Sequence, residues 1–311
     1  MNIAIFGATS YLARDLMLSF SRKSNVHIDL YGRSVEPINN WLYSKSLEKK
    51  YVALHYDAFN SELPYDAIIN FVGLGNPALA AASGASIFDI TLQYDTLALD
   101  YIQKNKSTKY IFVSSGAVYG SVFSEPINVN CKASIDINHI DPTDYYGVAK
   151  LYAEIKHRSF TDLNIVDVRV FNYFSSTMDL TTRFFISDIL RAIRDHTTLL
   201  TTANNIYRDY LHPDDFYQLI QCVLSGKKLN LALDCYTKAP IDKLTLLDEM
   251  KIHFGLNFAL INNEQDFGIN ATGLKDHYYS LNRRAESLSY QPTRTSLESI
   301  LHETNLILKS D

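Results

Sequence analysis

The sequence predicts a doubly wound α/β fold, a parallel sheet covered by helices and followed by a smaller C-terminal lobe. The chain opens with an apolar run, residues 2–6, that meets Gly7 and continues into a helical pattern. Further apolar runs of strand length then alternate with helical segments, which is typical of a parallel sheet. One of these runs, residues 111–115, ends in serines. Ligands of such folds bind at the carboxyl ends of the strands, so we expect the site there.

The composition is that of a globular protein with a slight excess of acids. Its 311 residues are 47% hydrophobic and 20% charged, with a formal net charge of −5. Without a basic run, this balance argues against nucleic acid as the main partner. Cys131, Cys222 and Cys235 are scattered, so we expect free thiols and no metal site. We find neither a signal sequence nor an apolar run of about 20 residues, and therefore expect a cytoplasmic protein with no membrane partner.

The first strand, Gly7 and the first helix have the order of a dinucleotide-binding turn. Leu12, Leu16 and Phe20 recur at helical spacing directly after the glycine. In this context the glycine permits a tight turn, and a pyrophosphate can lie at the helix N-terminus. The alternative is an ordinary α/β turn that holds no ligand.

The second strand, residues 26–34, ends in Gly-Arg-Ser rather than in an acid, because its one acid, Asp29, comes too early. An acid at this tip binds the ribose 2′-hydroxyl of NAD, whereas a nearby arginine accommodates the 2′-phosphate of NADP. We therefore expect NADP(H), with Arg33 on the 2′-phosphate, and keep NAD(H) as the alternative. Arg33 as an ordinary solvated surface charge also stays open.

The fifth strand and the helix after it carry three side chains suited to proton transfer. Ser115 ends residues 111–115, and Tyr146 and Lys150 stand four residues apart, hence on one helical face. A phenol has an unperturbed pKa of about 10, and a nearby ammonium favours the phenolate and lowers that pKa. Together the three would move a proton to or from a carbonyl or alcohol oxygen. We expect Tyr146 to act as acid or base while Ser115 polarises the carbonyl.

These motifs, SSGAVYG at residues 114–120 and YGVAK at residues 146–150, resemble the active site of the extended short-chain dehydrogenase/reductase family. Its members are NAD(P)-dependent nucleotide-sugar epimerases, dehydratases and reductases. The resemblance implies a Rossmann-type sheet, a hydride transfer, and Lys150 bound to the nicotinamide ribose. It covers most of the chain and thins out after about Pro240.

The resemblance also implies a cofactor site at the tips of the first four strands. The family carries glycines where this chain has Ser10 and Ala13. Asp57, at the end of the third strand, would face the adenine edge, or alternatively caps the next turn. Besides Arg33, Tyr146 and Lys150, the implied cofactor residues are Gly7, Ser10, Tyr11, Leu12, Asp57, Val72 and Gly73.

On the substrate side, the resemblance places Ser115 and Gly116 at the reacting group. Asn172 and Arg208 would hold the diphosphate of a nucleotide-linked substrate, for which a planar and permanently charged guanidinium is suited. The alternative for Asn172 is a turn residue that closes the sixth strand. Gly116-Ala117 replaces the acidic pair of the dehydratases, so elimination has no obvious acid or base. An arginine clamp known from some epimerases is replaced by Lys275-Asp276.

The remaining pattern completes the two-part organisation. We expect residues 1–171 and 204–236 to form the dinucleotide-binding domain, and residues 172–203 and 237–311 the smaller substrate-binding lobe. We expect further strands at residues 52–59, 65–73, 165–174 and 229–236. We expect helices at residues 184–193, 213–224 and 242–254.

The sequence leaves three functional hypotheses. The first is reduction of a keto group on a nucleotide-linked sugar by hydride transfer from NADP(H). The second is a 4-epimerase that holds NAD and needs no net redox partner. The third is a non-catalytic dinucleotide-binding module, which the departures at Ser10 and Ala13 favour and the Ser-Tyr-Lys set opposes. A homodimer is also possible, since family members often pair through two helices.

Overall fold

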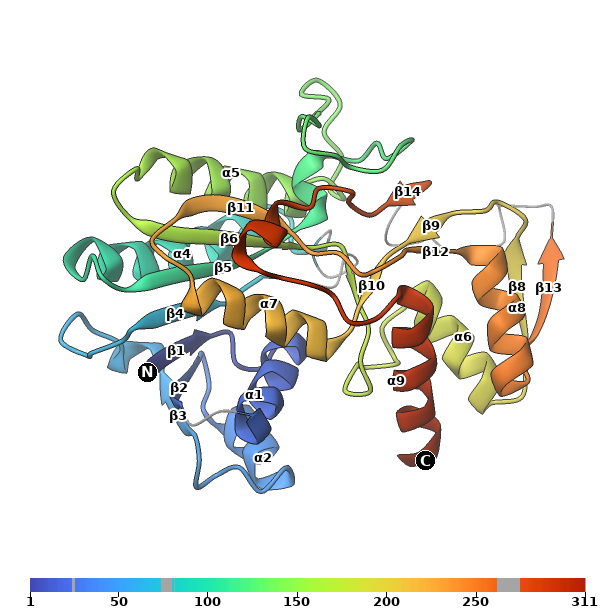
Figure 1. Cartoon of the computed structure of the whole chain (residues 1–311), viewed down its shortest axis with the longest axis horizontal. Helices are drawn as coiled ribbons and strands as arrows, with labels where there is room; N and C mark the ends of the chain where they lie inside the picture. Colours follow the sequence, from blue (N-terminus) through green and yellow to red (C-terminus); the bar gives the residue numbers. More distant parts are fainter. Residues whose placement is uncertain (24–25, 74–79, 81, 262–274, 311) are drawn as a thin grey trace.

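A parallel sheet of seven strands forms the centre of the larger part of the molecule (Figure 1). The computed structural model describes residues 1–23, 26–73, 80, 82–261 and 275–310. The strand order is β11-β6-β5-β4-β1-β2-β3, so the chain reverses direction across the sheet between β1 and β4. This confirms the predicted doubly wound fold. The strands are β1 (Asn2–Phe6), β2 (His27–Gly32), β3 (Val52–His55), β4 (Ala67–Asn70), β5 (Lys109–Ser115), β6 (Asn164–Val170) and β11 (Asn230–Asp234).

Helices cover both faces of this sheet, and the first strand shows why. Ile3 and Ile5 pack into the core beneath one set of helices, whereas Ala4 and Phe6 pack into the core beneath the other. Successive strand residues point to opposite faces, so a strand apolar throughout must be covered on both sides. One face carries α1 (Tyr11–Lys23), α2 (Glu36–Ser44) and α7 (Pro213–Ser225), and the other carries α4 (Ser86–Lys104) and α5 (Tyr145–Ser159) (Figure 1).

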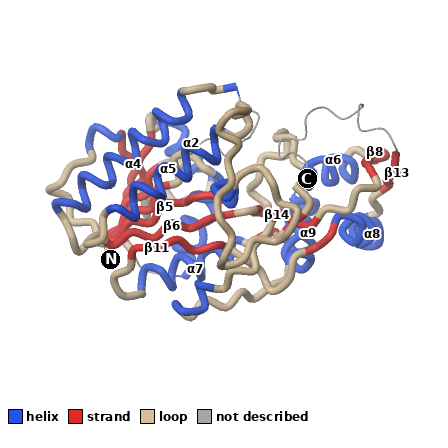
Figure 2. The backbone as a smooth tube through the Cα atoms, turned by 90° about the horizontal axis from the view of Figure 1, so that it is seen from above, coloured by secondary structure: helices blue, strands red, loops and turns tan. Residues whose placement is uncertain are grey.

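The smaller part lies beside the carboxyl ends of the strands and has an apolar core of its own (Figure 2). Its helices and its two-stranded parallel sheet are α6 (Phe185–Arg194), α8 (Lys243–Phe254), α9 (Ser296–Ser310), β8 (Thr198–Thr202) and β13 (Asn257–Ile261). Short strands connect the two parts: β7 (Asn172–Tyr173), β9 (Tyr207–Arg208), β10 (Tyr210–Leu211), β12 (Ile241–Asp242) and β14 (His277–Tyr278). Single 3-10 turns are η1 (Tyr56–Ala58), η2 (Gly116–Tyr119) and η4 (Arg284–Leu288).

Several predicted strands end earlier than their apolar patterns indicated, and in two of them a local contact explains the early end. The predicted strand 165–174 splits, because β6 ends at Val170 and β7 pairs with β10 outside the large sheet. Between them, Phe171 turns its ring toward Tyr119 and Tyr278. The predicted third strand likewise ends at His55, whose ring accepts a hydrogen bond from the N–H of Asp57 and begins η1.

Helix ends in the larger part are closed by side chains from distant segments. His212 caps α7 by accepting from the Asp214 N–H, at 3.0 Å. At the other end of α7, the buried Lys109 ammonium donates to the carbonyls of Val223 and Gly226. A cation at a helix C-terminus satisfies carbonyls that have no partner within the helix.

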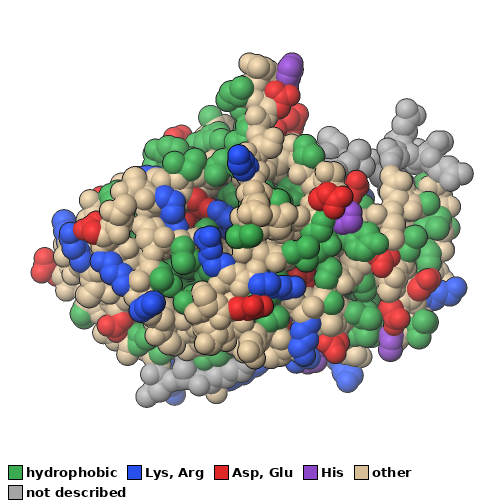
Figure 3. Space-filling view, turned by 45° about the horizontal axis from the view of Figure 1, so that its top comes forward, with side chains coloured by type: hydrophobic (Ala, Val, Ile, Leu, Met, Phe, Trp, Pro, Cys, Tyr) green, Lys and Arg blue, Asp and Glu red, His purple; other side chains and the backbone are tan. Residues whose placement is uncertain are grey.

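Two surface properties complete the description. Within the described residues, no helix is both long and apolar enough to cross a membrane. Basic and acidic side chains are intermixed over the face drawn in Figure 3.

Candidate active site

A cavity of about 230 Å³ opens between the carboxyl ends of the central strands and the smaller part. It lies where the doubly wound fold predicts a ligand. Nine predicted site residues line it: Ser10, Tyr11, Leu12, Gly73, Ser115, Tyr146, Lys150, Asn172 and Arg208. The other five, Gly7, Arg33, Asp57, Val72 and Gly116, lie outside its described lining.

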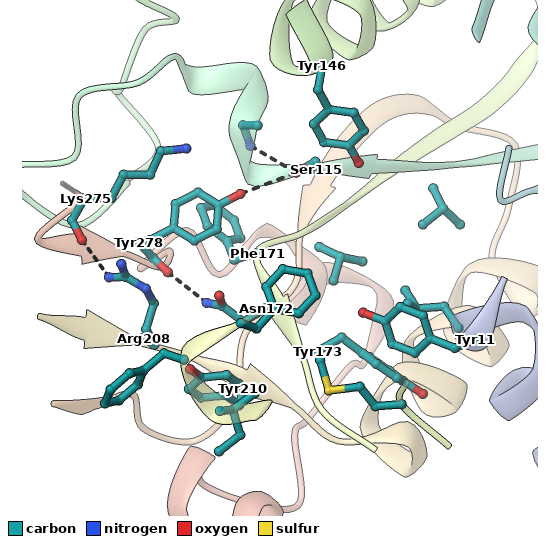
Figure 4. A pocket seen from close by; sticks show the side chains of 18 of the residues that line it. Tyr11, Ser115, Tyr146, Phe171, Asn172, Tyr173, Arg208, Tyr210, Lys275 and Tyr278 are labelled. Carbon is teal, nitrogen blue, oxygen red and sulfur yellow. Dashed lines mark hydrogen bonds between the residues drawn. The ribbon is translucent and has the colours of Figure 1, made fainter. Parts of the chain in front are cut away.

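Ser115, Tyr146 and Lys150 come together at one wall of this cavity (Figure 4). Ser115 ends β5, and its hydroxyl oxygen accepts from the Ala117 N–H at 3.2 Å. Tyr146 stands in the first turn of α5, with its ring beside Ser115. One turn later, the Lys150 ammonium donates to the carbonyls of Val72, at 3.2 Å, and Val113, at 2.9 Å.

The electrostatics of Tyr146 differ from the sequence-based expectation. Burial raises the pKa of Tyr146, the electrostatic interaction with the neighbouring Tyr278 phenol adds to this, and a hydrogen bond with Ser115 opposes it. The Lys150 ammonium lies 6.0 Å from the centre of the Tyr146 ring and donates to backbone carbonyls, so burial sets the direction of the Tyr146 pKa and not this lysine. Burial also lowers the pKa of Lys150 itself to about 8, against the opposing charges of Asp95, Glu154 and Asp167.

A buried ion cluster anchors the helix that carries Tyr146 and Lys150. The His157 ring in α5 lies between two carboxylates, with Nε2 2.6 Å from Asp95 and Nδ1 2.6 Å from Asp167. Burial alone would lower the pKa of His157, but the two carboxylates raise it to about 9. His157 is therefore protonated at neutral pH and ties α5 to both α4 and β6.

The turn before α1 has the geometry expected of a dinucleotide site. Gly7 has φ +72°, and a Cβ there would lie 3.0 Å from the backbone of Phe71, so glycine is required. Its N–H also donates to the Tyr56 hydroxyl, at 2.9 Å. Ser10, Tyr11 and Leu12 bring the N-terminus of α1 to the cavity, where the helix dipole favours an anion.

The tips of β2 and β3 carry the two charged residues predicted to bind the cofactor. Arg33 is exposed just beyond β2. The strand's acid, Asp29, is engaged elsewhere: it accepts from the Tyr65 hydroxyl at 2.6 Å and pairs with His27. The Asp57 side chain is 91% exposed and lies 3.0 Å from the His55 ring, so it points to solvent rather than into the cavity.

Gly116 supports the substrate wall from behind. A Cβ at this position would lie 2.4 Å from the Phe171 ring, which itself lines the cavity. The geometry therefore does not favour the predicted direct contact between Gly116 and the substrate. The residue leaves room for Phe171 instead.

The opposite end of the cavity is rich in cations. The Arg208 guanidinium is buried and donates to the carbonyls of Tyr207, at 2.8 Å, and Lys275, at 2.6 Å. Asn172 donates to the carbonyl of Tyr278, at 3.3 Å. The buried Lys243 ammonium donates to the carbonyl of Thr202, at 2.6 Å.

The sequence did not reveal Lys243 or Tyr278 as site residues, and it pointed to Lys275 only as a departure from the arginine clamp of some epimerases. All three lie after residue 236, where the family motifs fade, and no spacing connects them to the other site residues. With Lys150 and Arg208, the two lysines make four cations in the wall, and the described lining residues include no acid. An anionic ligand is the species that such a cavity accommodates best.

One further cluster has the residue types of a metal site. His212, His302 and Glu303 bring nitrogen and carboxylate atoms within 4.8 Å of one another. The His212 Nδ1 accepts from the Asp214 N–H, so Nε2 carries the proton and donates to Glu303, at 2.9 Å. Burial alone would raise the pKa of Glu303, but His212 and the Ser176 N–H hold it at about 2. Hydrogen bonding therefore explains this cluster without a metal.

The sequence profile of the NAD dependent epimerase/dehydratase family matches residues 4–232, which is more than half of the chain. The chain belongs to this family. It therefore joins a family of NAD-dependent nucleotide-sugar epimerases and dehydratases, as its Ser-Tyr-Lys motifs predicted. A comparison with curated proteins gives no match.

Solved structures agree with the family assignment at the level of the fold. The UDP-N-acetylglucosamine 4-epimerase of Methanobrevibacter ruminantium has a TM-score of 0.80 at 14% identity, over 100% of this chain and 99% of its own. The UDP-glucuronic acid 4-epimerase of Bacillus cereus, solved with UDP-glucuronic acid and NAD, has a TM-score of 0.77 at 15% identity over 100% of both chains. The dTDP-glucose 4,6-dehydratase of Bacillus anthracis, solved with NAD, gives 0.76 at 14%, over 100% of this chain and 97% of its own.

Proposed function

We propose that this epimerase/dehydratase-family protein transfers a hydride between a nicotinamide dinucleotide and a nucleotide-linked sugar, in the direction that reduces a keto group. The proposal rests on one observation: Ser115 and Tyr146 lie together at one wall of the cavity, and Lys150 lines the same wall. When bound, the nicotinamide supplies or accepts the hydride. Tyr146 gives a proton to the carbonyl oxygen in reduction, and Ser115 polarises that oxygen. Lys150 would hold the nicotinamide ribose, and its positive charge lies 6.0 Å from the centre of the Tyr146 ring.

The residues around the cavity fit the cofactor. Gly7 permits the tight turn, and Ser10, Tyr11 and Leu12 offer the N-terminus of α1 to the pyrophosphate. A Cβ at Gly73 would lie 3.2 Å from the Lys150 ammonium, so glycine leaves room for Lys150 at this wall of the cavity. Arg33 favours NADP(H) because it is exposed at the tip of β2 while Asp29 is engaged with Tyr65.

The substrate end supports a nucleotide diphosphate. Arg208 and Lys243 are both buried in the cavity wall and would hold the two phosphates, with Asn172 beside them. Residues 172–203 and 237–311 would form the substrate-binding lobe, with Arg208 reaching it from β9. Neighbouring folds solved with UDP-sugars are consistent with this class of substrate.

The test is Tyr146→Phe, with Tyr145→Phe as a matched control on the preceding residue. We expect Tyr146→Phe to lose turnover of a 4-keto nucleotide sugar while NADPH raises its melting temperature as in the wild type. Tyr145→Phe should keep turnover. Full activity in Tyr146→Phe would contradict the assignment.

A 4-epimerase is the second candidate, favoured by the 4-epimerases among the similar folds. It would hold NAD throughout the cycle and would interconvert UDP-sugars without net redox change. Purified protein that contains NAD and epimerises UDP-glucose with no added cofactor would put this candidate first.

The protein would pair with a second copy through α4 and α5. Leu92, Tyr152 and Ile155 on these helices are exposed apolar side chains and support a contact there. Light scattering of the purified chain distinguishes a dimer from a monomer.

A further inference from the structure

The cavity carries one cation more than a nucleotide diphosphate and the Ser-Tyr-Lys set require. Under the proposed function, Lys150 serves Tyr146 and the cofactor. Arg208 and Lys243 both line the cavity, and each is held in place there by backbone carbonyls. A diphosphate linkage carries one negative charge on each phosphate, so these two cations match it. Lys275 is then the cation without an assigned anion.

Lys275 stands at the reacting end of the cavity. Its ammonium lies 4.7 Å from the centre of the Tyr278 ring and 5.0 Å from that of Phe123. The hydroxyl of the same Tyr278 lies 3.4 Å from Ser115 Oγ, so a single ring separates Lys275 from the Ser-Tyr-Lys set. In Figure 4 the Lys275 side chain extends toward Ser115, whereas Arg208 lies on the far side and contacts the Lys275 carbonyl.

The ammonium of Lys275 is partly shielded from water, and no anion among the described residues pairs with it. Within the part of the chain that the structure describes, it forms no ion pair and donates no hydrogen bond. Burial lowers the pKa of Lys275 to about 8, Arg208 adds to this, and Asp144 opposes it. Aromatic faces attract a cation but leave its three N–H donors without acceptors. A carboxylate brought by the ligand would supply both charge and acceptors.

We propose that Lys275 binds a carboxylate on the sugar of the nucleotide-linked substrate, so that the protein prefers an acidic sugar to a neutral one. The inference rests on the proposed function, because it takes the diphosphate on Arg208 and the reacting carbon at Tyr146 as fixed points. A sugar held between them presents its substituents to the wall where Lys275 stands. A third contact to the diphosphate is the competing role for this lysine.

Binding measurements on the full chain separate these roles. Titrating UDP and dTDP by calorimetry, with NADP⁺ present, first selects the nucleotide. The same nucleotide is then compared alone, with glucose and with glucuronic acid attached, in the wild type and in Lys275→Met. Lys275→Arg keeps the charge, and Lys132→Met removes an exposed lysine elsewhere as a matched control.

We expect the wild type to bind the glucuronic acid derivative about 10- to 100-fold more tightly than the glucose derivative, the range of one charge-assisted contact. Lys275→Met should remove that difference and leave the affinities for the bare nucleotide and the glucose derivative unchanged. Lys275→Arg should retain most of the preference, and Lys132→Met all of it.

Three outcomes would overturn the inference. If Lys275→Met weakens the bare nucleotide as much as the acidic sugar, Lys275 contacts the diphosphate. If the wild type binds both sugars equally, Lys275 selects no carboxylate, and the proposed function stands. If the wild type binds neither nucleotide nor any derivative, the proposed function fails and the inference with it.

Discussion

The hydroxyl of Tyr278 lies 3.4 Å from Ser115 Oγ, which joins β14 to the end of β5. Ser115 Oγ already accepts from the Ala117 N–H, so a second bond from the Tyr278 hydroxyl would fill its acceptor positions. The Ser115 O–H, which lowers the pKa of Tyr146 in this structure, would then turn to the substrate oxygen when substrate binds. Tyr278 thus acts as a positioning residue under the proposed function.

Replacing Tyr278 by Phe removes this hydroxyl and keeps the ring. We expect kcat to fall about 3- to 10-fold, the effect of losing one net hydrogen bond, while the melting-temperature shift caused by NADPH stays unchanged. Steady-state kinetics and thermal shift measure the two effects. Tyr279→Phe is the control on the next residue, and an unchanged kcat in Tyr278→Phe would rule out the positioning role.

Replacing Arg33 by Gln tests the cofactor preference. The guanidinium should contribute a charge-assisted contact to the 2′-phosphate and none to NADH. We therefore expect the Kd for NADPH to rise about 10- to 100-fold and the Kd for NADH to change little. Fluorescence titration measures both, with the exposed Arg22→Gln as control. Equal effects on both dinucleotides would show that Arg33 does not read the 2′-phosphate.

The His157 cluster predicts a pH dependence of stability. The pKa of His157 is about 9 in the fold and about 6.5 in an unfolded chain. Its protonated form is therefore favoured by folding, and this contribution is complete below about pH 6.5 and is lost as the pH rises through about 9. Its upper limit is about 3 kcal/mol. Urea unfolding of the wild type and of His157→Gln between pH 6.5 and 9.5 measures this contribution. The free energy of unfolding should fall more steeply with pH in the wild type, and parallel pH profiles would contradict the prediction.

We expect the contacts of Lys109 at the end of α7 to contribute to the stability of the fold. Its buried ammonium donates to the Val223 and Gly226 carbonyls, so Lys109→Met removes two hydrogen bonds at this helix end, although the Val223 carbonyl still accepts from the Gly226 N–H. We expect a loss of about 1–3 kcal/mol in the free energy of unfolding, measured with urea. Lys106→Met, which removes an exposed pair with Asp162, should cost far less. Equal losses in the two variants would show that the cap is not important.

Local patterns in the sequence predicted much of the fold. The apolar runs indicated the seven strands of the large sheet, and Gly255, with φ +69°, ends α8 as expected. The break at Phe171 was not predictable, because the apolar run continues through it and only tertiary contacts with Tyr119 and Tyr278 turn it aside.

Local motifs likewise predicted some residues of the site and not others. The spacing of Tyr146 and Lys150 follows from helix geometry, so one motif was enough to predict that they lie together. Lys275 and Tyr278 reach the same cavity from a segment more than a hundred residues away, which no periodicity reveals. The pKa of Tyr146 was predicted in the wrong direction, because burial depends on the packing of the whole cavity.

Because β7 pairs with β10 outside the large sheet, the larger part of the molecule is not one continuous stretch of the chain. The polypeptide leaves the large sheet after Val170, comes back to supply α7 and β11, and then leaves again. A fragment ending at residue 171 would therefore lack the edge strand β11 and the helix α7, which packs against α1 beside Phe20. We expect such a fragment to aggregate on expression, and the intact chain to melt in one calorimetric transition.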